Sequence, residues 1–434
     1  MVGKRRVSEG SKEDAFFKKI MEKFKDNEFN IEKTTAVLEE VKKHVSSISA
    51  DQRIDFIKHC KAQLADAAKA NRWDIADQLL KFLRASLEQD ETWPEGSVEE
   101  YIYSLYCDVI CPGRKKEGKV VLKLSDEVLS NAKWMSTIAR LLDLCIDAVT
   151  TTQSEQAFRT FVKVTAALLL TRKDEFHFRG SSELVNSYCH VIRSAAFLFL
   201  VLLEKNRSNV EAALSLLHKQ AYCEKIWSQI RDATEISVQL SLSVATKILC
   251  DDGSNSGKNF RDLFTGSLSV AESKAFFSIS KDSEESIREF VSKINLQRDA
   301  QTRCFTTTCR MMSDGKQTFE ALVDWNIRAL SIRKQNMDPI QVCYSNLRDA
   351  VNFDDRAYKA TFIKLAPELC ADELEFSFSD PDEYRSVKQA IENRTFSACS
   401  GRALRKASRA FLISNSARSP EVGFTYSSEY AKAC

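Results

Sequence analysis

The stretch Glu183–Asn206, ELVNSYCHVIRSAAFLFLVLLEKN, contains nine consecutive apolar residues between Ala195 and Leu203. A helix that is apolar on every side must be buried on every side, so other helices have to surround it. Nine residues rise by roughly 14 Å, whereas a bilayer crossing needs roughly 20 residues. The stretch therefore predicts a core helix and no membrane contact, with Phe197, Leu200 and Leu203 as core anchors.

The composition points to long helices joined by short connections. The chain has 434 residues, of which 44% are hydrophobic and 29% are charged, which is typical of globular domains with substantial cores. It contains only 12 glycines and 6 prolines, and all-β folds use these residues in their many turns. We therefore predict an all-α fold.

The thirteen cysteines indicate a reducing compartment. They are scattered without C-x-x-C pairs, and the first residues, MVGKRRVSEG, contain no apolar signal core. We expect free, buried thiols in a protein of the cytosol or nucleus.

One polar break divides the apolar pattern. Asp251–Asn259, DDGSNSGKN, is small, polar and glycine-containing between two apolar segments, which is typical of a linker. It predicts two helical lobes with a central hinge. The expected organisation is an N-terminal arm at 1–29, helical lobes at 30–250 and 260–393 joined by the linker 251–259, and a basic mobile tail at 394–434.

The second lobe is also expected to be helical. Only Leu374–Phe378, LEFSF, alternates like a strand, and an isolated strand is marginal. The predicted helices of this lobe include 270–277, 300–312, 318–332, 339–352, 356–369 and a last helix that begins after Asp380.

No motif for catalysis or for a cofactor stands out. Gly253–Lys258, GSNSGK, has its glycines one residue too close for a phosphate-binding loop, and Asn259 replaces the magnesium-binding hydroxyl. Cys189 with His190 lacks the second ligand pair of a zinc site. We expect no enzyme activity, no metal and no cofactor.

The charges are balanced overall but locally segregated. The chain has 63 Lys and Arg against 61 Asp and Glu. The range 293–334 nevertheless holds eight basic and four acidic residues, with Phe305 and Trp325 among them. One interpretation is a solvated helix face, and the other is a groove for a phosphate backbone. The candidate RNA contacts are Arg298, Arg303, Arg310, Lys316, Arg328, Arg333 and Lys334, with Arg114, Lys115 and Lys116 of the loop Cys111–Lys119 as secondary contacts.

The stretch Arg193–Trp227, RSAAFLFLVLLEKNRSNVEAALSLLHKQAYCEKIW, resembles the central region of nucleocapsid proteins from plant negative-strand RNA viruses, namely ophiovirus coat proteins and plant rhabdovirus nucleoproteins. The resemblance implies a viral nucleoprotein, or capsid protein, that encapsidates single-stranded RNA without sequence specificity. Its terminal arms would join subunits into a homo-oligomeric ribonucleoprotein. It also implies a location in the host cytoplasm or nucleus and in the virion, with viral or host proteins as further partners.

Two other classes remain as alternatives for a helical chain. The first is an armadillo- or HEAT-like helical-repeat scaffold that binds protein partners, although no self-similarity at a fixed period is visible. The second is a PCI-type subunit of a large complex, although the chain shows no recognisable winged-helix end. A raised 260 to 280 nm absorbance ratio of the purified protein would separate the nucleoprotein from both.

Overall fold

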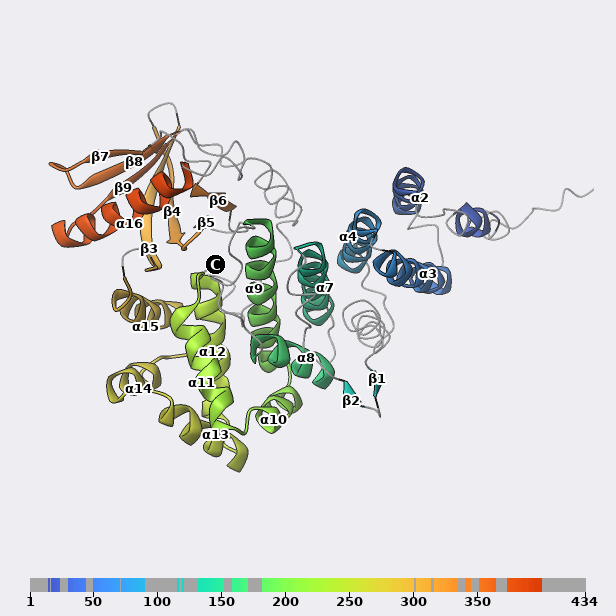
Figure 1. Ribbon diagram of the computed structural model, residues 1–434, viewed down its shortest axis with the longest axis horizontal. Coiled ribbons are helices and arrows are strands. Elements are labelled where there is room, and N and C mark those ends of the chain that lie inside the picture. Colours follow the sequence, from blue (N-terminus) through green and yellow to red (C-terminus); the bar gives the residue numbers. More distant parts are fainter. Residues whose placement is uncertain are drawn as a thin grey trace, which may run out of the picture. The chain divides into compact units, whose positions relative to one another are not determined.

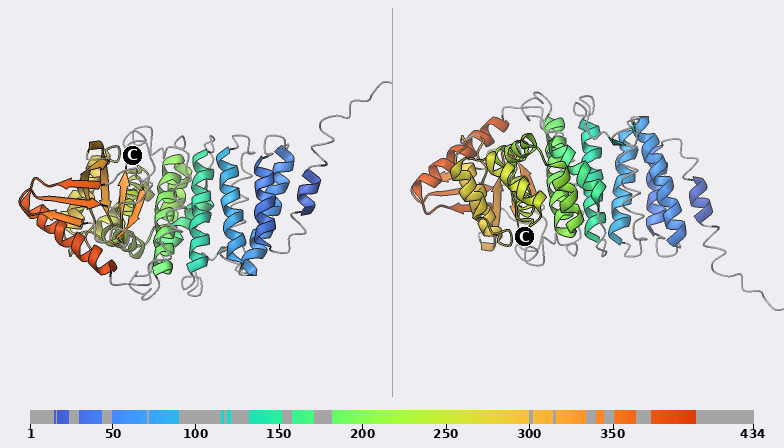
Figure 2. Two further views of the ribbon diagram at one scale, coloured as in Figure 1. Left: turned by 90° about the horizontal axis from the view of Figure 1, so that it is seen from above. Right: turned by 90° about the horizontal axis from the view of Figure 1, so that it is seen from below.

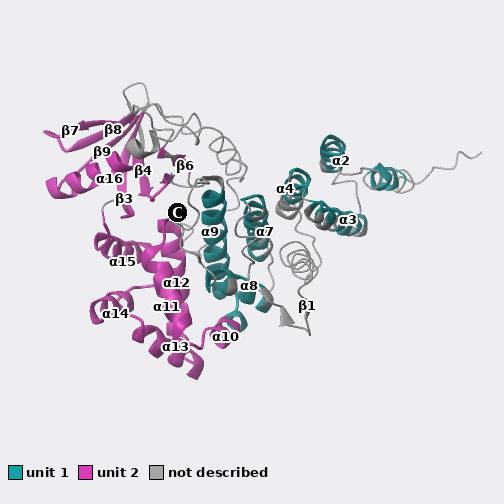
Figure 3. Ribbon diagram, viewed as in Figure 1, with its two compact units in different colours: residues 1–179, 184–209 teal, residues 180–183, 210–434 magenta. Residues whose placement is uncertain are grey.

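The computed structural model divides into two compact units (Figure 3). Unit 1 comprises residues 1–179 and 184–209, and unit 2 comprises residues 180–183 and 210–434. The structure describes residues 15, 17–23, 30–43, 50–70, 72–89, 115–116, 119–120, 132–151, 158–170, 182–299, 302–313, 316–333, 340–344, 351–363 and 373–399.

Unit 1 is a stack of helices with a short hairpin. The helix α4 packs against α2 and α3, which precede it in the chain, and against α7, which follows it. Figures 1 and 2 show these helices following one another in sequence order. The elements are α2 (Ile31–Lys43), α3 (Ala50–Lys69), α4 (Trp73–Gln89), β1 (Lys115–Lys116), β2 (Lys119–Val120), α7 (Ala132–Thr151), α8 (Arg159–Leu170) and most of α9 (Ser182–Lys205).

The helix α9 contains the apolar stretch of the sequence. Every residue from Ala195 to Leu203 is buried except Phe197, which is half-buried. By length and composition, Leu184–Lys205 could also cross a membrane, but 72% of its apolar window is buried inside the protein. The predicted core helix is therefore confirmed, with Leu200 and Leu203 in the core, whereas the prediction of Phe197 as a core anchor is wrong because its side chain is only half-buried.

A few polar bridges fix the helices of unit 1. The buried Asn209 side chain accepts a hydrogen bond from Phe158 N at 2.7 Å and donates one to Leu202 O at 2.8 Å. It thereby ties the start of α8 to the last turn of α9. Because a buried amide is costly unless its polar atoms are paired, these bonds define how the two segments meet.

Unit 2 begins with helices gathered around α12. This helix is buried along most of its length and packs against α11, α13 and α15. An aromatic chain joins its neighbours, because the Phe264 ring contacts Trp227 at 6.3 Å and Phe276 at 5.0 Å, and Phe276 contacts Phe290 at 5.6 Å. The helices are α10 (Arg207–Leu216), α11 (Gln220–Asp232), α12 (Ile236–Asp251), α13 (Asn255–Gly266), α14 (Val270–Phe277) and α15 (Glu284–Leu296).

The second part of unit 2 is a curled, seven-stranded antiparallel sheet with a helix, called here the half-barrel (Figure 1). The strands lie in the order β6-β5-β4-β3-β9-β8-β7, and α16 places Val387 and Ile391 in the core of the sheet. The elements are β3 (Phe305–Ser313), β4 (Lys316–Trp325), β5 (Ala329–Arg333), β6 (Ile340–Cys343), β7 (Val351–Asp354), β8 (Lys359–Ile363), β9 (Glu373–Ser377) and α16 (Pro381–Cys399).

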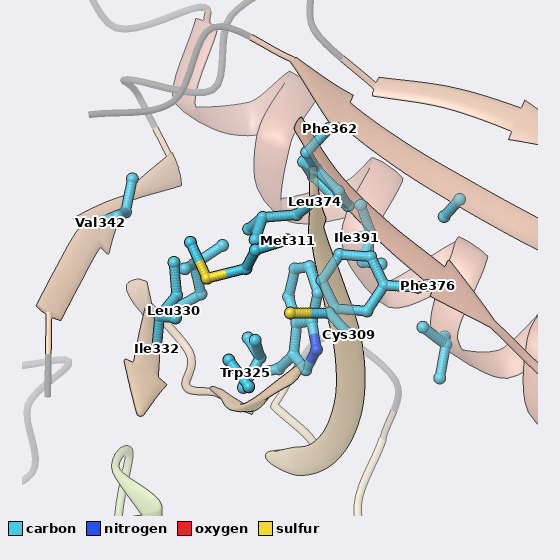
Figure 4. Close-up of a cluster of buried hydrophobic side chains, with 14 of the residues drawn as sticks. Cys309, Met311, Trp325, Leu330, Ile332, Val342, Phe362, Leu374, Phe376 and Ile391 are labelled. Atoms are coloured by element: carbon cyan, nitrogen blue, oxygen red, sulfur yellow. The ribbon is translucent and has the colours of Figure 1, made fainter. Parts of the chain in front are cut away.

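Trp325 is the centre of the half-barrel core (Figure 4). Its ring is fully buried and lies 5.5 Å from that of Phe305, 5.4 Å from Phe362 and 5.2 Å from Phe376. Its indole Nε1 donates to Thr307 Oγ1 at 2.8 Å. The strands β3, β8 and β9 therefore all contact this one residue of β4.

The helices and the half-barrel of unit 2 are hydrogen-bonded to each other. The Asn326 side chain accepts from the backbone N–H of Ile236 at 2.9 Å, at the first turn of α12. Ile327 N donates to Thr234 O at 3.1 Å. A turn of the sheet thus supplies a partner to an N–H group that a helix start leaves unsatisfied.

The predicted all-α fold is wrong, because the ranges expected to be helical at 300–312, 318–332, 339–352 and 356–369 contain strands β3 to β8. In β3, Cys309 and Met311 point into the core while Thr308 and Arg310 are exposed, a period of two. The low glycine content had favoured helices over strands, but the β7–β8 turn forms without a glycine. Tyr358 adopts a φ of 51°, and the Asp354 carboxylate accepts two backbone N–H bonds.

The predicted central hinge is also wrong. Asp251 is the last residue of α12, and Ser254 caps α13 by accepting from Gly257 N at 3.1 Å. The two helices pack on each other inside unit 2. A Cβ added at Gly257 would lie 2.2 Å from Asp252 O, so this glycine serves a close approach of the backbone rather than flexibility.

The chain ends differ in part from the expected arms. In the range 1–29, residues 17–23 are helical, Ile20 and Met21 are buried, and Lys23 forms an ion pair with Glu40 at 2.9 Å. At the other end α16 continues to Cys399, and Arg394 is buried. Residues 400–434 of the expected tail lie outside the described residues.

Candidate functional site

Three of the predicted RNA contacts have structural partners within unit 2. Arg298 donates to Ala233 O at 2.8 Å, and Arg303 donates to Ser386 Oγ at 2.7 Å. Arg333 donates to the Asp324 carboxylate at 2.9 Å, and its side chain is 14% exposed. These guanidinium groups hold helices and strands together, so binding RNA would require them to leave their present partners.

Arg310 and Arg328 remain exposed. The Arg310 side chain lies on the outer face of β3, is 52% exposed and is 3.8 Å from Glu375. Arg328 lies in the turn between β4 and β5. Both are available to solvent, and their role in RNA binding stays a prediction.

For three of the other predicted contacts, the structure describes the strand in which each lies. Lys115 and Lys116 form β1, and Lys316 begins β4. Arg114 and Lys334 lie outside the described residues. In the hairpin of β1 and β2, Lys116 is paired with Lys119, so the structure brings lysines of the predicted cationic loop to opposite positions.

A buried charge cluster connects α15 to β4 and β5. The Asp324 side chain, 2% exposed, accepts from Arg288 at 3.1 Å, Arg333 at 2.9 Å and Thr306 at 2.8 Å. Glu284 accepts from Arg288 at 2.5 Å. Burial raises the pKa of Asp324, but the charges of Arg333 and Arg288 outweigh it and hold the pKa below its ordinary value. The cluster is largely buried and joins the helix to the two strands.

Unit 1 contains a serine, an aspartate and a histidine in contact. Asp143 on α7 accepts from Ser194 Oγ at 2.6 Å and lies 3.0 Å from His190 Nε2, with both partners on α9. In a nucleophilic triad the histidine lies between the other two and takes the serine proton. Here the aspartate lies between them and Ser194 is buried, so the arrangement bridges two helices and does not activate a nucleophile.

The cysteines whose side chains the structure describes are buried and poorly suited to nucleophilic chemistry. Burial raises the pKa of Cys223, Cys250 and Cys309 to about 12 in each case and that of Cys304 to about 11. The reactive thiolate is therefore scarce near neutral pH. Among the residues that the structure describes, no three His, Cys, Asp or Glu side chains are grouped as metal ligands.

The open end of the half-barrel is a better candidate for function. The last strand in the sheet order is β7, and β8 is its one partner among the described strands (Figure 1). Val351 and Phe353 are half-buried against the core, whereas Asn352 and Asp354 are exposed. An edge strand presents backbone N–H and C=O groups that can pair with another strand.

A half-buried aromatic cluster lies where α16 begins beside this strand. Tyr384 is at its centre and is 2% exposed. The ring centroids of Phe353, Tyr358 and Phe378 lie 6.5, 5.6 and 5.7 Å from that of Tyr384. These three residues are only partly covered, so an added side chain could extend the cluster.

Charged groups hold this cluster in place. Asp355 Oδ1 accepts from Tyr384 OH at 2.8 Å and from Lys388 Nζ at 2.7 Å, and Nζ lies 5.2 Å from the centroid of Phe353. The bonds from Lys388 and Tyr384 lower the pKa of Asp355, while burial and the bond to Asp355 raise the pKa of Tyr384. We call Val351–Asp354 together with Tyr358, Phe378, Tyr384 and Lys388 the edge surface.

The sequence interpretation missed the edge surface, although a signal was present. The segments of β7, β8 and β9 read VNFD, KATFI and ELEFS, and apolar and polar residues alternate in the first and last and in the first four residues of the second. Only the last was recognised as strand-like. Each run is short, and the pairing that reveals an edge joins residues distant in sequence.

Comparisons with known proteins add little. No protein-family model matches the chain, and no curated protein matches it. A solved structure titled "Synaptonemal complex protein" is similar at 13% identity, over 78% of this chain and 87% of that chain, with a TM-score of 0.49. A likeness at this level carries no argument about function.

Proposed function

We propose that this chain is a protein-binding scaffold that accepts an extended segment of a partner protein at the edge surface. The observation that carries the proposal is the open strand β7 beside a half-buried aromatic cluster. In strand addition, the backbone bonds supply affinity and pockets for alternate side chains supply specificity. Phe353 and its neighbours would contact every second side chain of the added segment.

The helices of unit 1 support the same class of function. In this unit α4 packs against α2, α3 and α7, which are its neighbours among the described helices, and contacts between neighbouring helices are typical of helical-repeat proteins. Such stacks present extended helix surfaces to partners. This agrees with the helical-repeat scaffold raised as an alternative from the sequence.

The test is selection of extended peptides against the full-length protein by display. Selected peptides should bind the wild type and lose binding in Phe353→Lys, because a charge would replace a ring of the cluster. Thr308→Lys, on the exposed outer face of β3, is the matched control and should keep binding. A thermal melt shows that both variants are folded. Peptides that ignore Phe353→Lys, or a selection that returns none, would contradict the proposal.

The second candidate function is binding of single-stranded RNA in a nucleoprotein, as the sequence resemblance suggests. The pairing of Lys116 with Lys119, next to Lys115, favours it because adjacent cations attract a phosphate backbone. We expect Lys115→Glu with Lys116→Glu to weaken RNA binding and flatten its salt dependence, whose log-log slope is about −0.7 per phosphate contacted. Fluorescence anisotropy with a labelled oligonucleotide measures both. Absence of binding at low salt would remove this candidate.

A further inference from the structure

The rim of the edge surface carries carboxylates that accept backbone N–H bonds at Asp354 and Asp380 but have no cationic partner among the described residues. Asp354, Asp380 and Glu383 are exposed and form no ion pair with another described residue. Arg356 is the exposed basic residue of the same turn without such a pair. The carboxylates Asp355 and Asp382 are already neutralised by Lys388 and Arg385. The strand β7 therefore favours an incoming segment with basic residues.

The chain continues past α16 with a segment of this chemistry. Residues 400–434 hold six Lys or Arg and two Glu. Within them Arg409–Ser414, RAFLIS, places four apolar residues directly after a cluster of basic ones that includes Arg405 and Lys406. Phenylalanine and isoleucine favour strands, and Phe411 and Ile413 would lie on one face of a strand.

The connection is long enough for this segment to return to β7. Tyr384, in the edge surface, lies 15 residues before the end of α16, or about 22 Å along the helix. The residues between Cys399 and Phe411 can span up to about 40 Å when extended. The tail can therefore run back beside α16 within the same chain.

We propose that Arg409–Ser414 adds to β7 of its own chain as an eighth strand and occupies the edge surface. Phe411 and Ile413 lie on the inner side, where they extend the cluster of Phe353 and Tyr358. The basic residues that precede the segment face the acidic rim. The inference rests on the proposed function only in treating the edge surface as a docking site, and it makes the tail a competitor of the partner.

Hydrogen exchange of the full-length protein tests the occupancy. The variant Phe411→Asp with Ile413→Asp removes the two inner side chains and adds two negative charges to the tail. The matched control, Val422→Asp with Phe424→Asp, makes the same charge change further along the tail. We expect the outward-facing amides of Val351–Asp354 to exchange about tenfold faster in the first variant, and as in the wild type in the control.

Two outcomes would overturn the inference. If these amides already exchange at the variant's rate in the wild type, the edge is not occupied by the tail. If their protection rises with protein concentration, the occupant comes from a second copy of the chain. The substitutions lie outside the described core, so an unchanged melt establishes that the fold is intact.

The display peptides separate this inference from the proposed function. Selection is repeated on the Phe411→Asp, Ile413→Asp variant, and the peptides should bind it at least about tenfold more tightly than the control variant, since no tail competes. Equal binding to both variants would contradict the proposal that the tail occupies the edge surface, and the scaffold proposal would be unaffected. If the tail protects β7 but no peptide binds, the scaffold proposal is contradicted and the proposal for the tail is supported.

Discussion

The stack of unit 1 and the half-barrel of unit 2 use polar groups differently. In unit 1, Asp143 bridges α7 and α9 through His190 and Ser194. In the half-barrel, Asp324 lies nearly buried between two arginines, and Arg303 reaches Ser386 across 83 residues of sequence. Both regions have apolar cores, but the half-barrel also contains buried charges whose partners lie far away in the sequence.

This difference affects how each region should respond to substitution. A lost apolar side chain costs its transfer free energy and a cavity. A lost partner of a buried charge leaves the other charge uncompensated, which costs more than the pair contributes. The largest single effects are therefore expected in the half-barrel.

Asp324→Ala should give the largest effect, a loss of about 3–5 kcal/mol in the free energy of unfolding, because Arg288 and Arg333 would lose their shared carboxylate. Urea denaturation followed by circular dichroism measures it. The control Glu320→Ala removes an exposed carboxylate from the same strand and should change stability by less than about 0.5 kcal/mol. Similar values for the two variants would show that the cluster contributes nothing.

Leu200→Ala tests the apolar side of the comparison. Leu200 is fully buried in α9, so its truncation should cost about 2–5 kcal/mol and lower the melting temperature. Lys163→Ala, at an exposed position of α8, is the control and should leave the melt nearly unchanged. If the Leu200 variant melted like the wild type, α9 would not be the core of unit 1.

The pH dependence of stability should differ between wild type and Asp324→Asn. The pKa of Asp324 is lowered in the folded protein, so its contribution is fully present above the unfolded value of about 3.9. It is lost as the pH falls through the lower, folded value. Urea midpoints measured from pH 6 downward should therefore fall more steeply for the wild type. Parallel curves would mean that the carboxylate has an ordinary pKa.

The smallest expected effect separates backbone strain from side-chain packing at Tyr358. Both Tyr358→Gly and Tyr358→Ala remove the contact with Tyr384. Only glycine accepts the positive φ of 51° without a steric cost, so the glycine variant should be more stable than the alanine variant by about 1 kcal/mol. Thermal melts of the pair measure the difference, and equal melting temperatures would show that the turn relaxes.

Local periodicity in the sequence determined most of the helices. The predicted core stretch is α9, and the helices expected at Val270–Phe277 and after Asp380 are α14 and α16. Capping serines such as Ser269 explain this accuracy, because a cap and an apolar stripe lie within a few residues of one another. Trp325, by contrast, was placed in the predicted helix 318–332, and Arg298 was a candidate RNA contact. Trp325 is instead the centre of the sheet core, and Arg298 donates to Ala233 O.

The tertiary structure alone decided the sheet and the edge surface. The strand pairing of β3 with β9 joins residues more than sixty positions apart, and no local pattern specifies it. Whether β7 lies at an edge depends on the complete strand order, and the neighbours of Tyr384 come from three separate segments. The physical reason is that helices satisfy their backbone hydrogen bonds locally, whereas a sheet satisfies them between distant strands and leaves its edge unpaired.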